Sequence, residues 1–325
     1  MATAATTPAK PVVSTTSAGS AINRVTLPYI IAIAAQLPLL LYYFSNLWAR
    51  PHYQFFPFAI LMVVAFAVIR WPRNLQEPFF RRRLSVVLFW SGIVFGVAGA
   101  LFAESWFSAA SMVMLMASLF GMTRDGEVSG KNLLVLSLPL VIILMLPFNW
   151  DFSLITFLQR VSAQISSWYL DILNFKHYSP GTTLNFPDQN YEVERACSGV
   201  QSFFTLLFCT SFLIISLRRP WLRATLLLIS AGFWAVFMNS IRILVIPIAD
   251  QVFGIDLKEG LQHELLGYTV MLIAVALILS TDQLLEFLFG RSSNQVDDEG
   301  KPGFVRRLFS RKTRATSDQE STTRY

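Results

Sequence analysis

Long runs of apolar residues constrain this chain more than any other feature of its sequence. A helix that crosses the hydrocarbon core of a bilayer needs roughly 20 mostly apolar residues. Eight stretches reach or approach that length, namely 26–48, 53–70, 84–103, 106–123, 131–148, 199–217, 222–248 and 264–287. Only 14% of the residues are charged, whereas soluble chains carry roughly 25%. The sequence therefore predicts an all-α fold, a polytopic transmembrane helix bundle of about eight spans.

Composition excludes several other classes of protein. Two cysteines cannot cross-link 325 residues, so a secreted disulfide scaffold is excluded. A hydrophobic content of 54% excludes an intrinsically disordered chain. The net charge of +6 does not indicate a nucleic-acid partner, because the short loops between the predicted spans hold ten of the 26 lysines and arginines, a pattern that reflects membrane topology. We expect the lipid bilayer to surround the chain and no nucleic acid to bind it.

Lysines and arginines are distributed unequally between the two sides of the predicted bundle. The short connections 70–83, 124–131 and 218–223 together carry ten, whereas the opposite side carries five over far more sequence. Because short loops rich in lysine and arginine face the cytoplasm, both termini are predicted to be cytoplasmic. Segment 150–198 and loop 249–263 would then be extracytoplasmic, in a multi-pass protein of the cytoplasmic (inner) membrane.

The segments outside the spans differ in character. Residues 1–25 and 289–325 are predicted to be disordered cytoplasmic tails, the second of them basic, which leaves 26–288 as the membrane domain. The turn formers of Tyr178–Asn190 predict an extended loop or a hairpin. Before it, apolar residues at helical spacing predict an amphipathic helix at the extracytoplasmic membrane surface; they are Phe152, Ile155, Leu158, Ile165, Trp168 and Ile172.

Arg242 is the clearest polar residue inside a predicted span. It lies about six residues before the outer end of stretch 222–248, which is roughly 9 Å at 1.5 Å per residue. A charge at the centre of a bilayer costs at least ~2.5–3.5 kcal/mol on insertion scales, so its presence needs a reason. An arginine that only snorkels to the interface is one explanation. It does not explain why Asn239, three residues earlier, lies on the same helical face.

Cys197 lies at the outer start of the sixth predicted span, in the segment VERACSGVQS (193–202). The unpaired N–H groups and the dipole at a helix N-terminus favour a thiolate. A passive small hydrophobe is the alternative role for a membrane cysteine, and Cys209, in the middle of the same span, fits that role.

His263 lies at the outer start of the last predicted span. Glu259 is one turn before it and can orient the imidazole, and Gly267 is one turn after it. An interfacial polar residue is the alternative. However, the charge distribution independently places Cys197, Arg242 and His263 near the same outer face of the membrane. There Cys197 would supply a nucleophile, Arg242 an oxyanion stabiliser and His263 an acid–base group. That combination predicts a cysteine acyl-transfer site.

At these residues the sequence resembles the exosortase/archaeosortase family of membrane transpeptidases. Members of that family have Cys-Ser-Gly opening one span, Asn-x-x-Arg late in the next and His-x-x-x-Gly opening the last. The corresponding motifs here are Ala196–Gly199 (ACSG), Asn239–Arg242 (NSIR) and His263–Gly267 (HELLG), in the same order and spacing. The resemblance covers about residues 26–288. One departure is Arg195, at a position where the family is often acidic, and it bears on the choice of substrate.

The resemblance implies a cysteine-type peptidase or transpeptidase. Cys197 would be the nucleophile, and Arg242 and His263 the other catalytic residues. The substrates implied are exported proteins with a C-terminal sorting signal, made of a short motif, a transmembrane helix and a basic cluster. Cleavage through a thioester would pass the protein to a cell-surface acceptor, and no cofactor or metal is expected. The supporting residues are Ser198, Gly199, Asn239, Glu259 and Gly267.

Two other classes of function remain open from the sequence. A transporter or channel would use Asn239 and Arg242 to line a polar path, although neither repeat symmetry nor a discontinuous helix pair is seen around them. A cysteine-dependent membrane acyltransferase would use Cys197 on a lipid instead of a peptide.

The predicted topology can be tested by labelling single cysteines with a membrane-impermeant reagent. We expect reagent added from outside to reach cysteines placed at 180–190 or near 256, and not those at 75 or 127, because the lysine and arginine bias keeps the latter two loops in the cytoplasm. Labelling of position 127 from outside would contradict both the topology and the shared level of the three site residues.

Overall fold

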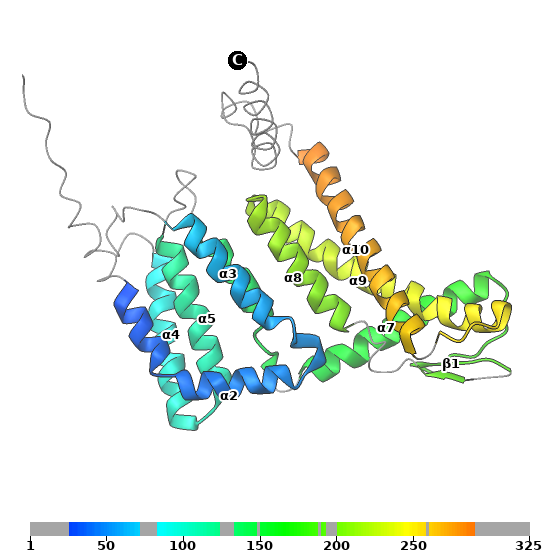
Figure 1. Cartoon of the computed structure of the whole chain (residues 1–325), viewed down its shortest axis with the longest axis horizontal. Coiled ribbons are helices and arrows are strands. Elements are labelled where there is room, and N and C mark those ends of the chain that lie inside the picture. Colours follow the sequence, from blue (N-terminus) through cyan, green and yellow to red (C-terminus); the bar gives the residue numbers. More distant parts are fainter. Residues whose placement is uncertain are drawn as a thin grey trace, which may run out of the picture. The chain divides into compact units, whose positions relative to one another are not determined.

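The computed structural model describes residues 26–71, 83–123, 133–147, 150–187, 190–192, 200–257 and 260–289. Helices make up nearly all of these residues, which confirms the all-α prediction (Figure 1). The helices are α2 (Leu37–Trp48), α3 (Phe56–Arg70), α4 (Arg83–Phe102), α5 (Ser105–Met122), α6 (Leu138–Ile142), α7 (Trp150–Ile172), α8 (Val200–Ser216), α9 (Trp221–Phe253) and α10 (Gly260–Phe289). Two compact units divide the chain at Ile278, and the packing described below is that of the first, up to Ile278.

Among the described residues, five helical segments are long and apolar enough to cross a membrane. They are Pro51–Arg70, Arg83–Phe102, Ser105–Met122, Trp221–Phe253 and Gly260–Phe289. The helix Thr26–Ala34 and α2 pass the same test together, but they are bent by 68° at the break between them. Pro38 lies in the first turn of α2, where its ring disfavours continuous helix through the preceding residues. These segments confirm a polytopic helical membrane protein; the count of eight spans stays a prediction.

The predicted span 131–148 does not form one long helix in its described part. Residues Leu134–Ser137 form the 3₁₀ turn η3, and α6 follows with only five residues. Pro139 lies in the first turn of α6, so it supplies no backbone N–H and favours a break from the preceding turn. A broken segment therefore takes the place of the expected helix within residues 133–147.

Small residues let α4 and α5 approach closely. A Cβ atom added at Gly96 of α4 would lie 3.0 Å from the Ser111 hydroxyl of α5 and 2.7 Å from the Gln36 amide nitrogen, so a larger residue there would force these side chains to move. Ser111 also donates a hydrogen bond of 2.7 Å to the Gly92 carbonyl. Hydrogen bonds and small residues are the usual means of helix association in lipid, where no hydrophobic force drives helices together.

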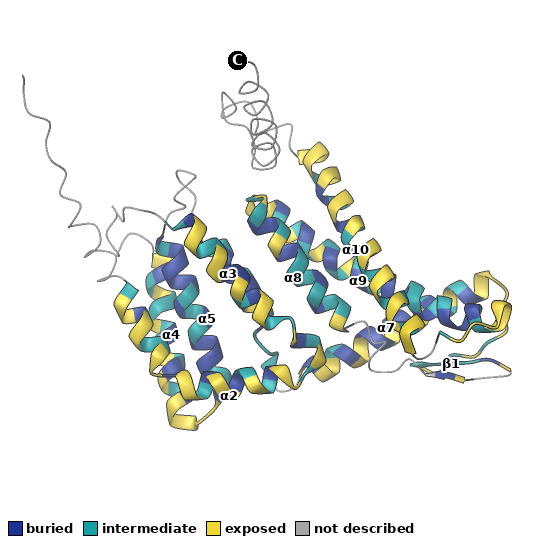
Figure 2. Ribbon diagram, viewed as in Figure 1, coloured by how far each residue is buried: buried dark blue, intermediate teal, exposed yellow. Residues whose placement is uncertain are grey.

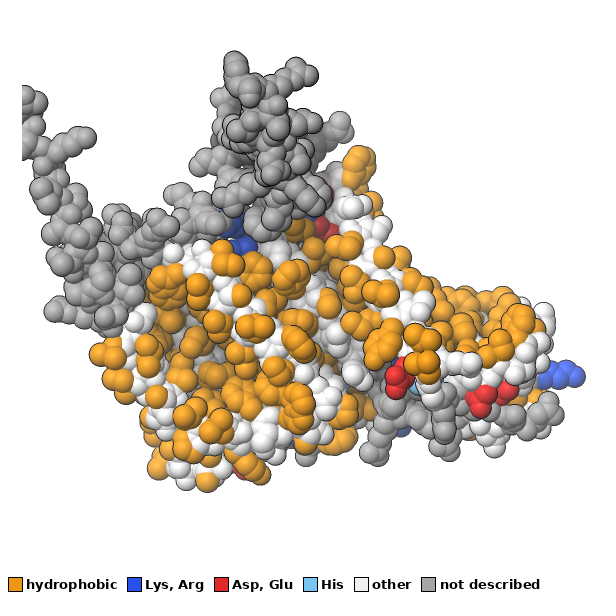
Figure 3. All heavy atoms as spheres, in the orientation of Figure 1, with side chains coloured by type: hydrophobic (Ala, Val, Ile, Leu, Met, Phe, Trp, Pro, Cys, Tyr) orange, Lys and Arg blue, Asp and Glu red, His pale blue; other side chains and the backbone are white. Residues whose placement is uncertain are grey.

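The outer faces of the helices are apolar. Leu101 at the end of α4 is 77% exposed, Val68 of α3 is 74% exposed, and Leu272 of α10 is 71% exposed. Exposed residues run along α4 and α10, whereas α5 is largely buried (Figure 2). Apolar side chains cover much of the face shown in Figure 3. Exposure on this scale fits a protein surrounded by lipid, since large apolar patches are unusual on soluble monomers.

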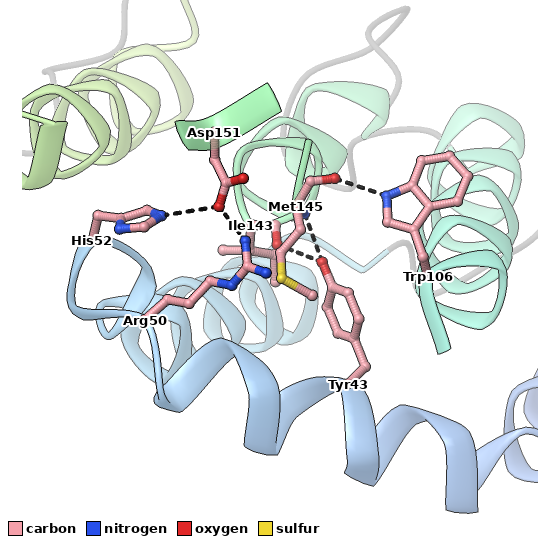
Figure 4. A network of polar contacts seen from close by, with 7 residues as sticks. All are labelled: Tyr43, Arg50, His52, Trp106, Ile143, Met145 and Asp151. Atoms are coloured by element: carbon pink, nitrogen blue, oxygen red, sulfur yellow. Dashed lines mark hydrogen bonds and ion pairs between the residues drawn. The ribbon is translucent and has the colours of Figure 1, made fainter. Parts of the chain in front are cut away.

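A buried polar network ties the corner between α2 and α3 to the start of α7 (Figure 4). Arg50 pairs with the fully buried Asp151, and His52 Nε2 lies 3.6 Å from the same carboxylate. Beside them, the Tyr43 hydroxyl donates to the Ile143 carbonyl (3.0 Å) and accepts from the Met145 N–H (2.7 Å). Trp106 of α5 donates to the Met145 carbonyl. These bonds satisfy backbone groups that the broken segment after α6 leaves without helical partners.

Contacts on the two sides of the bundle agree with the relative topology predicted from charge. Arg50 and Asp151, both predicted on the extracytoplasmic side, contact each other. Arg70, predicted on the cytoplasmic side, donates a 2.7 Å bond to the Ile215 carbonyl at the end of α8. Which side faces outward stays a prediction.

The predicted amphipathic helix is confirmed as α7, but its faces differ from the expectation. Ile155 and Leu158 are buried as expected, whereas Phe152, Trp168 and Ile172 are exposed. Polar side chains, including Gln159, Ser162 and Ser166, share the buried face with Ile155 and Leu158. The physical reason is that this face packs against another helix, α9, where small side chains permit close contact.

The described residues 183–185 and 190–192 pair as the predicted hairpin. Strand β1 (Thr183–Asn185) pairs antiparallel with β2 (Asn190–Glu192), with Leu184 opposite Tyr191. The Tyr191 hydroxyl donates a 2.8 Å bond to the Asp250 carboxylate near the end of α9. The hairpin side chains Leu184 and Phe186 belong to a buried cluster with Leu170 of α7 and Ile243 of α9. The hairpin thus packs against the C-terminal part of α9, which carries Arg242 and Asp250.

Candidate functional site

Arg242 lies further inside its helix than the sequence indicated. α9 continues to Phe253, so Arg242 is eleven residues before the helix end instead of about six before residue 248. At 1.5 Å per residue this is about 17 Å along the helix. The side chain is half-buried, so its charge needs partners within the protein.

His263 provides one of those partners. It lies in the first turn of α10, which begins at Gly260 with a positive φ of 75°. The distance from Arg242 Nη2 to His263 Nε2 is 2.7 Å, and that from His263 Nδ1 to the Leu257 carbonyl oxygen is 2.8 Å. A guanidinium only donates hydrogen bonds and a carbonyl only accepts them. The imidazole in this arrangement is therefore neutral, with its proton on Nδ1 and its lone pair on Nε2.

Gly267 makes room for the guanidinium. A Cβ atom added at this position would lie 3.3 Å from both Cζ and Nη2 of Arg242, which is tighter than an ordinary contact. A side chain there would push the guanidinium away from its place beside His263. The spacing of His263 and Gly267, one turn apart, thus has a steric reason.

Asn239 is buried, and its side chain donates a hydrogen bond to α7. Its Nδ2 donates to the Ser162 hydroxyl of α7 at 3.1 Å. Ser166, one turn along α7, donates to the carbonyls of both Ser162 (2.7 Å) and Ser240 (2.8 Å). The α7 serines therefore hold the turn of α9 that precedes Arg242. Sequence reasoning missed them, although their spacing of four residues places both on one helical face.

A pocket lies between α8, α9 and α10. Arg242, Asn239 and Ser202 are its polar lining residues. The other lining residues are Leu206, Ala235, Met238, Gly267, Val270, Met271 and Ala274. The Nε atom of Arg242 is buried and has no hydrogen-bond partner among the residues that the structure describes. The guanidinium thus retains a donor beyond the one directed at His263.

Several predicted site residues lie outside the described ranges: Arg195, Cys197, Ser198, Gly199 and Glu259. α8 begins at Val200, three residues after Cys197, and its first two turns carry Ser202 and Leu206 into the pocket lining. Cys209 is half-buried within α8, in keeping with a packing role. Across the described ranges no group of three or more His, Cys, Asp or Glu side chains is arranged to hold a metal ion.

Comparison with known families identifies the class of protein. Residues 48–280 match the family described as Transmembrane exosortase (Exosortase_EpsH). The match covers well over half of the chain and includes all three motifs, and the chain therefore belongs to the transmembrane exosortase family. Among curated proteins and among solved structures, no match was found.

The protonation of His263 can be tested directly. With ¹⁵N-labelled histidine in the purified full-length protein at neutral pH, we expect the His263 imidazole to give a signal with a protonated Nδ1 and an unprotonated Nε2. That signal should disappear in His263→Gln and should shift in Arg242→Lys, because the donor to Nε2 changes. Protonation of His263 Nε2 in the parent protein would contradict the hydrogen-bond assignment.

Proposed function

We propose that this exosortase is a membrane-embedded cysteine peptidase/transpeptidase that uses Cys197, Arg242 and His263. The observation that carries the proposal is the direct hydrogen bond between Arg242 and His263, which come from two helices and from two separate motifs. Family membership and the start of α8 just after Cys197 support it further. A channel or transporter receives no comparable support.

The first half of the reaction would form a thioester. The Cys197 sulfur attacks the carbonyl carbon of the scissile peptide bond, and its proton passes to Nε2 of His263. The negative charge that develops on the carbonyl oxygen is stabilised by N–H groups of Arg242. When the C–N bond breaks, the leaving amine takes the proton from His263, which returns to its neutral form.

The second half would transfer the acyl group. A nucleophile of the acceptor attacks the thioester carbonyl and gives its proton to His263, and the C–S bond then breaks with the proton returning to sulfur. The acceptor can be water or a cell-surface molecule, and the residues at the site do not distinguish the two. In both halves of the reaction every proton that is transferred has a donor and an acceptor among Cys197, His263, the substrate and the acceptor, so no step requires a cofactor.

The hydrogen bond between Arg242 and His263 would also control when the base is available. While Arg242 Nη2 donates to the lone pair of Nε2, the imidazole cannot accept a proton from Cys197. A substrate carbonyl offers Arg242 a better acceptor, since it carries developing negative charge in the transition state. Binding of substrate would therefore free Nε2 at the step that needs it.

The partners follow from the same proposal. Substrates would be exported proteins whose C-terminal sorting signal contains a motif, a transmembrane helix and a basic cluster. With both termini in the cytoplasm, the site would open on the extracytoplasmic side of the inner membrane. The basic cluster of the substrate would then stay in the cytoplasm while the motif reaches the site.

Substitution of Cys197 tests the nucleophile. We expect Cys197→Ala and Cys197→Ser to abolish cleavage of a reporter with a sorting tail, because a serine hydroxyl is far less ionised than a thiol. Cys209→Ala is the matched control and should keep most of the activity. Cleavage is measured by immunoblot and normalised to the amount of enzyme in the membrane. Parental cleavage by Cys197→Ala would end the acyl-enzyme proposal.

Arg242→Lys separates catalysis from membrane anchoring. Lysine snorkels as well as arginine but lacks its planar set of donors. We therefore expect normal insertion and a loss of turnover of about 100-fold, as for one lost oxyanion donor.

Two neighbouring substitutions complete the comparison. His263→Ala should lose as much turnover as Arg242→Lys. Asn239→Ala should lose less, because this substitution removes the bond to Ser162 and leaves the guanidinium in the chain. The same normalised reporter assay measures all three variants. Near-parental cleavage by Arg242→Lys would support the anchor role and leave Cys197 and His263 as a dyad.

A further inference from the structure

A buried ion pair lies outside the site described above and has no part in the proposed chemistry. Asp151, in the first turn of α7, is fully buried and pairs with Arg50 at the corner between α2 and α3. Such a pair adds little net stability, because desolvation offsets the attraction between the charges. Where a buried pair does have a role, that role is to fix one particular packing.

The corner that carries this pair packs against the start of α8. The Phe204 ring lies 5.8 Å from the His52 ring and 4.9 Å from the Tyr53 ring, measured between centroids. His52 lies beside the Asp151 carboxylate as well (Figure 4). Val200, the first residue of α8, is buried in the same cluster as Tyr53 and Phe204. The ion pair is therefore linked to the start of α8 through these rings.

Further ring contacts continue along α8. Phe208 stacks on Phe55 with 5.4 Å between centroids, and Phe212 lies 6.0 Å from Phe66. Because Phe204, Phe208 and Phe212 are four residues apart, they form one stripe of the helix. This stripe holds α8 lengthwise against α3, and its first member, Phe204, meets the corner.

The opposite face of α8 lines the candidate site. Ser202 and Leu206 lie beside the pocket to which Arg242 contributes. Each is two residues from Phe204, which is about 200° around a helix. The start of α8 therefore stands between the corner and Arg242. Since α8 begins three residues after Cys197, and three residues span at most about 11 Å, its placement limits where the sulfur can lie.

We propose that Asp151, Arg50 and Phe204 are positioning residues for the nucleophile. The buried pair holds the corner, the corner holds Phe204, and Phe204 holds the helix whose start follows Cys197. The proposal rests on the function proposed above, in which the Cys197 sulfur must reach Nε2 of His263. Asp151, Arg50 and Phe204 themselves exchange no proton and form no bond with the substrate.

The reactivity of Cys197 tests the proposal in the full-length enzyme. With Cys209→Ala as the background, Cys197 is the only thiol in the chain, and its rate of alkylation by iodoacetamide is measured against pH. A guanidinium beside a thiol favours the thiolate. Displacement of the sulfur from Arg242 should therefore move the midpoint of the alkylation profile to higher pH. A loss of folded protein alone would lower the amplitude and leave the midpoint in place.

Phe204→Leu and Asp151→Asn are the two test variants. Phe204→Leu removes the ring contacts without a change of charge. Asp151→Asn keeps the shape of the side chain and removes the charge that pairs with Arg50. Loss of a negative charge would by itself move the midpoint to lower pH, so a shift to higher pH reports displacement. For both variants we expect that shift, and a fall in kcat of about 10-fold with KM for the reporter unchanged, because small misplacements of reacting groups slow the chemical step.

Two matched controls repeat these changes elsewhere. Phe212→Leu lies about two turns further along α8, and Asp171→Asn lies at an exposed position of α7. Both should keep the parental midpoint and kcat. Parental values in Phe204→Leu would overturn the proposal, even if Asp151→Asn did not accumulate, and so would equal shifts in the controls. Failure of the proposed function has a different signature, namely parental cleavage by Cys197→Ala, which would leave no nucleophile to position.

Discussion

The guanidinium of Arg242 must find its hydrogen-bond acceptors inside the protein, because the hydrocarbon core offers no water. The neutral imidazole of His263 supplies one acceptor at 2.7 Å, and the absence of a side chain at Gly267 supplies the space. His263 and Gly267 both belong to α10, so the start of α10 must lie where it can meet the guanidinium of α9. The turn before α10 contributes as well, since the Leu257 carbonyl holds the far side of the imidazole.

The helix α7 supports this arrangement from the other side. In water, serines on a buried helical face would be poor packing residues, but in a bilayer small hydroxyl side chains permit close contact and pair with backbone carbonyls. The Ser162 hydroxyl accepts a hydrogen bond from the Asn239 side-chain amide, and the Ser166 hydroxyl donates to the Ser240 carbonyl, both in the turn before Arg242. The hairpin adds a bond from Tyr191 to Asp250 at the end of α9. α9 is therefore held before and after its charged residue, which keeps the guanidinium donors directed at one place.

Much of this site could be predicted from the sequence, and the exceptions have identifiable causes. The rarity of charge within spans singled out Arg242, and helical spacing paired His263 with Gly267. The structure brings these three together. Asn239 lies on the helical face that it shares with Arg242, and its side chain donates to Ser162 of α7; helical spacing shows which face a residue lies on but not which helix lies opposite.

The sequence by itself determined the class of protein: the length of its apolar runs requires a helical membrane protein, and its three motifs mark it as an exosortase. Helix starts and breaks at prolines follow from covalent geometry, so they too depend only on residues close together in the sequence. Only the tertiary structure decided the partners of the buried polar groups. It pairs Arg50 with Asp151, 101 residues apart, and Arg242 with His263 across two helices. It also leaves a pocket beyond the guanidinium. Such pairings depend on the packing of separate helices, which satisfies each buried charge only once the whole bundle has assembled.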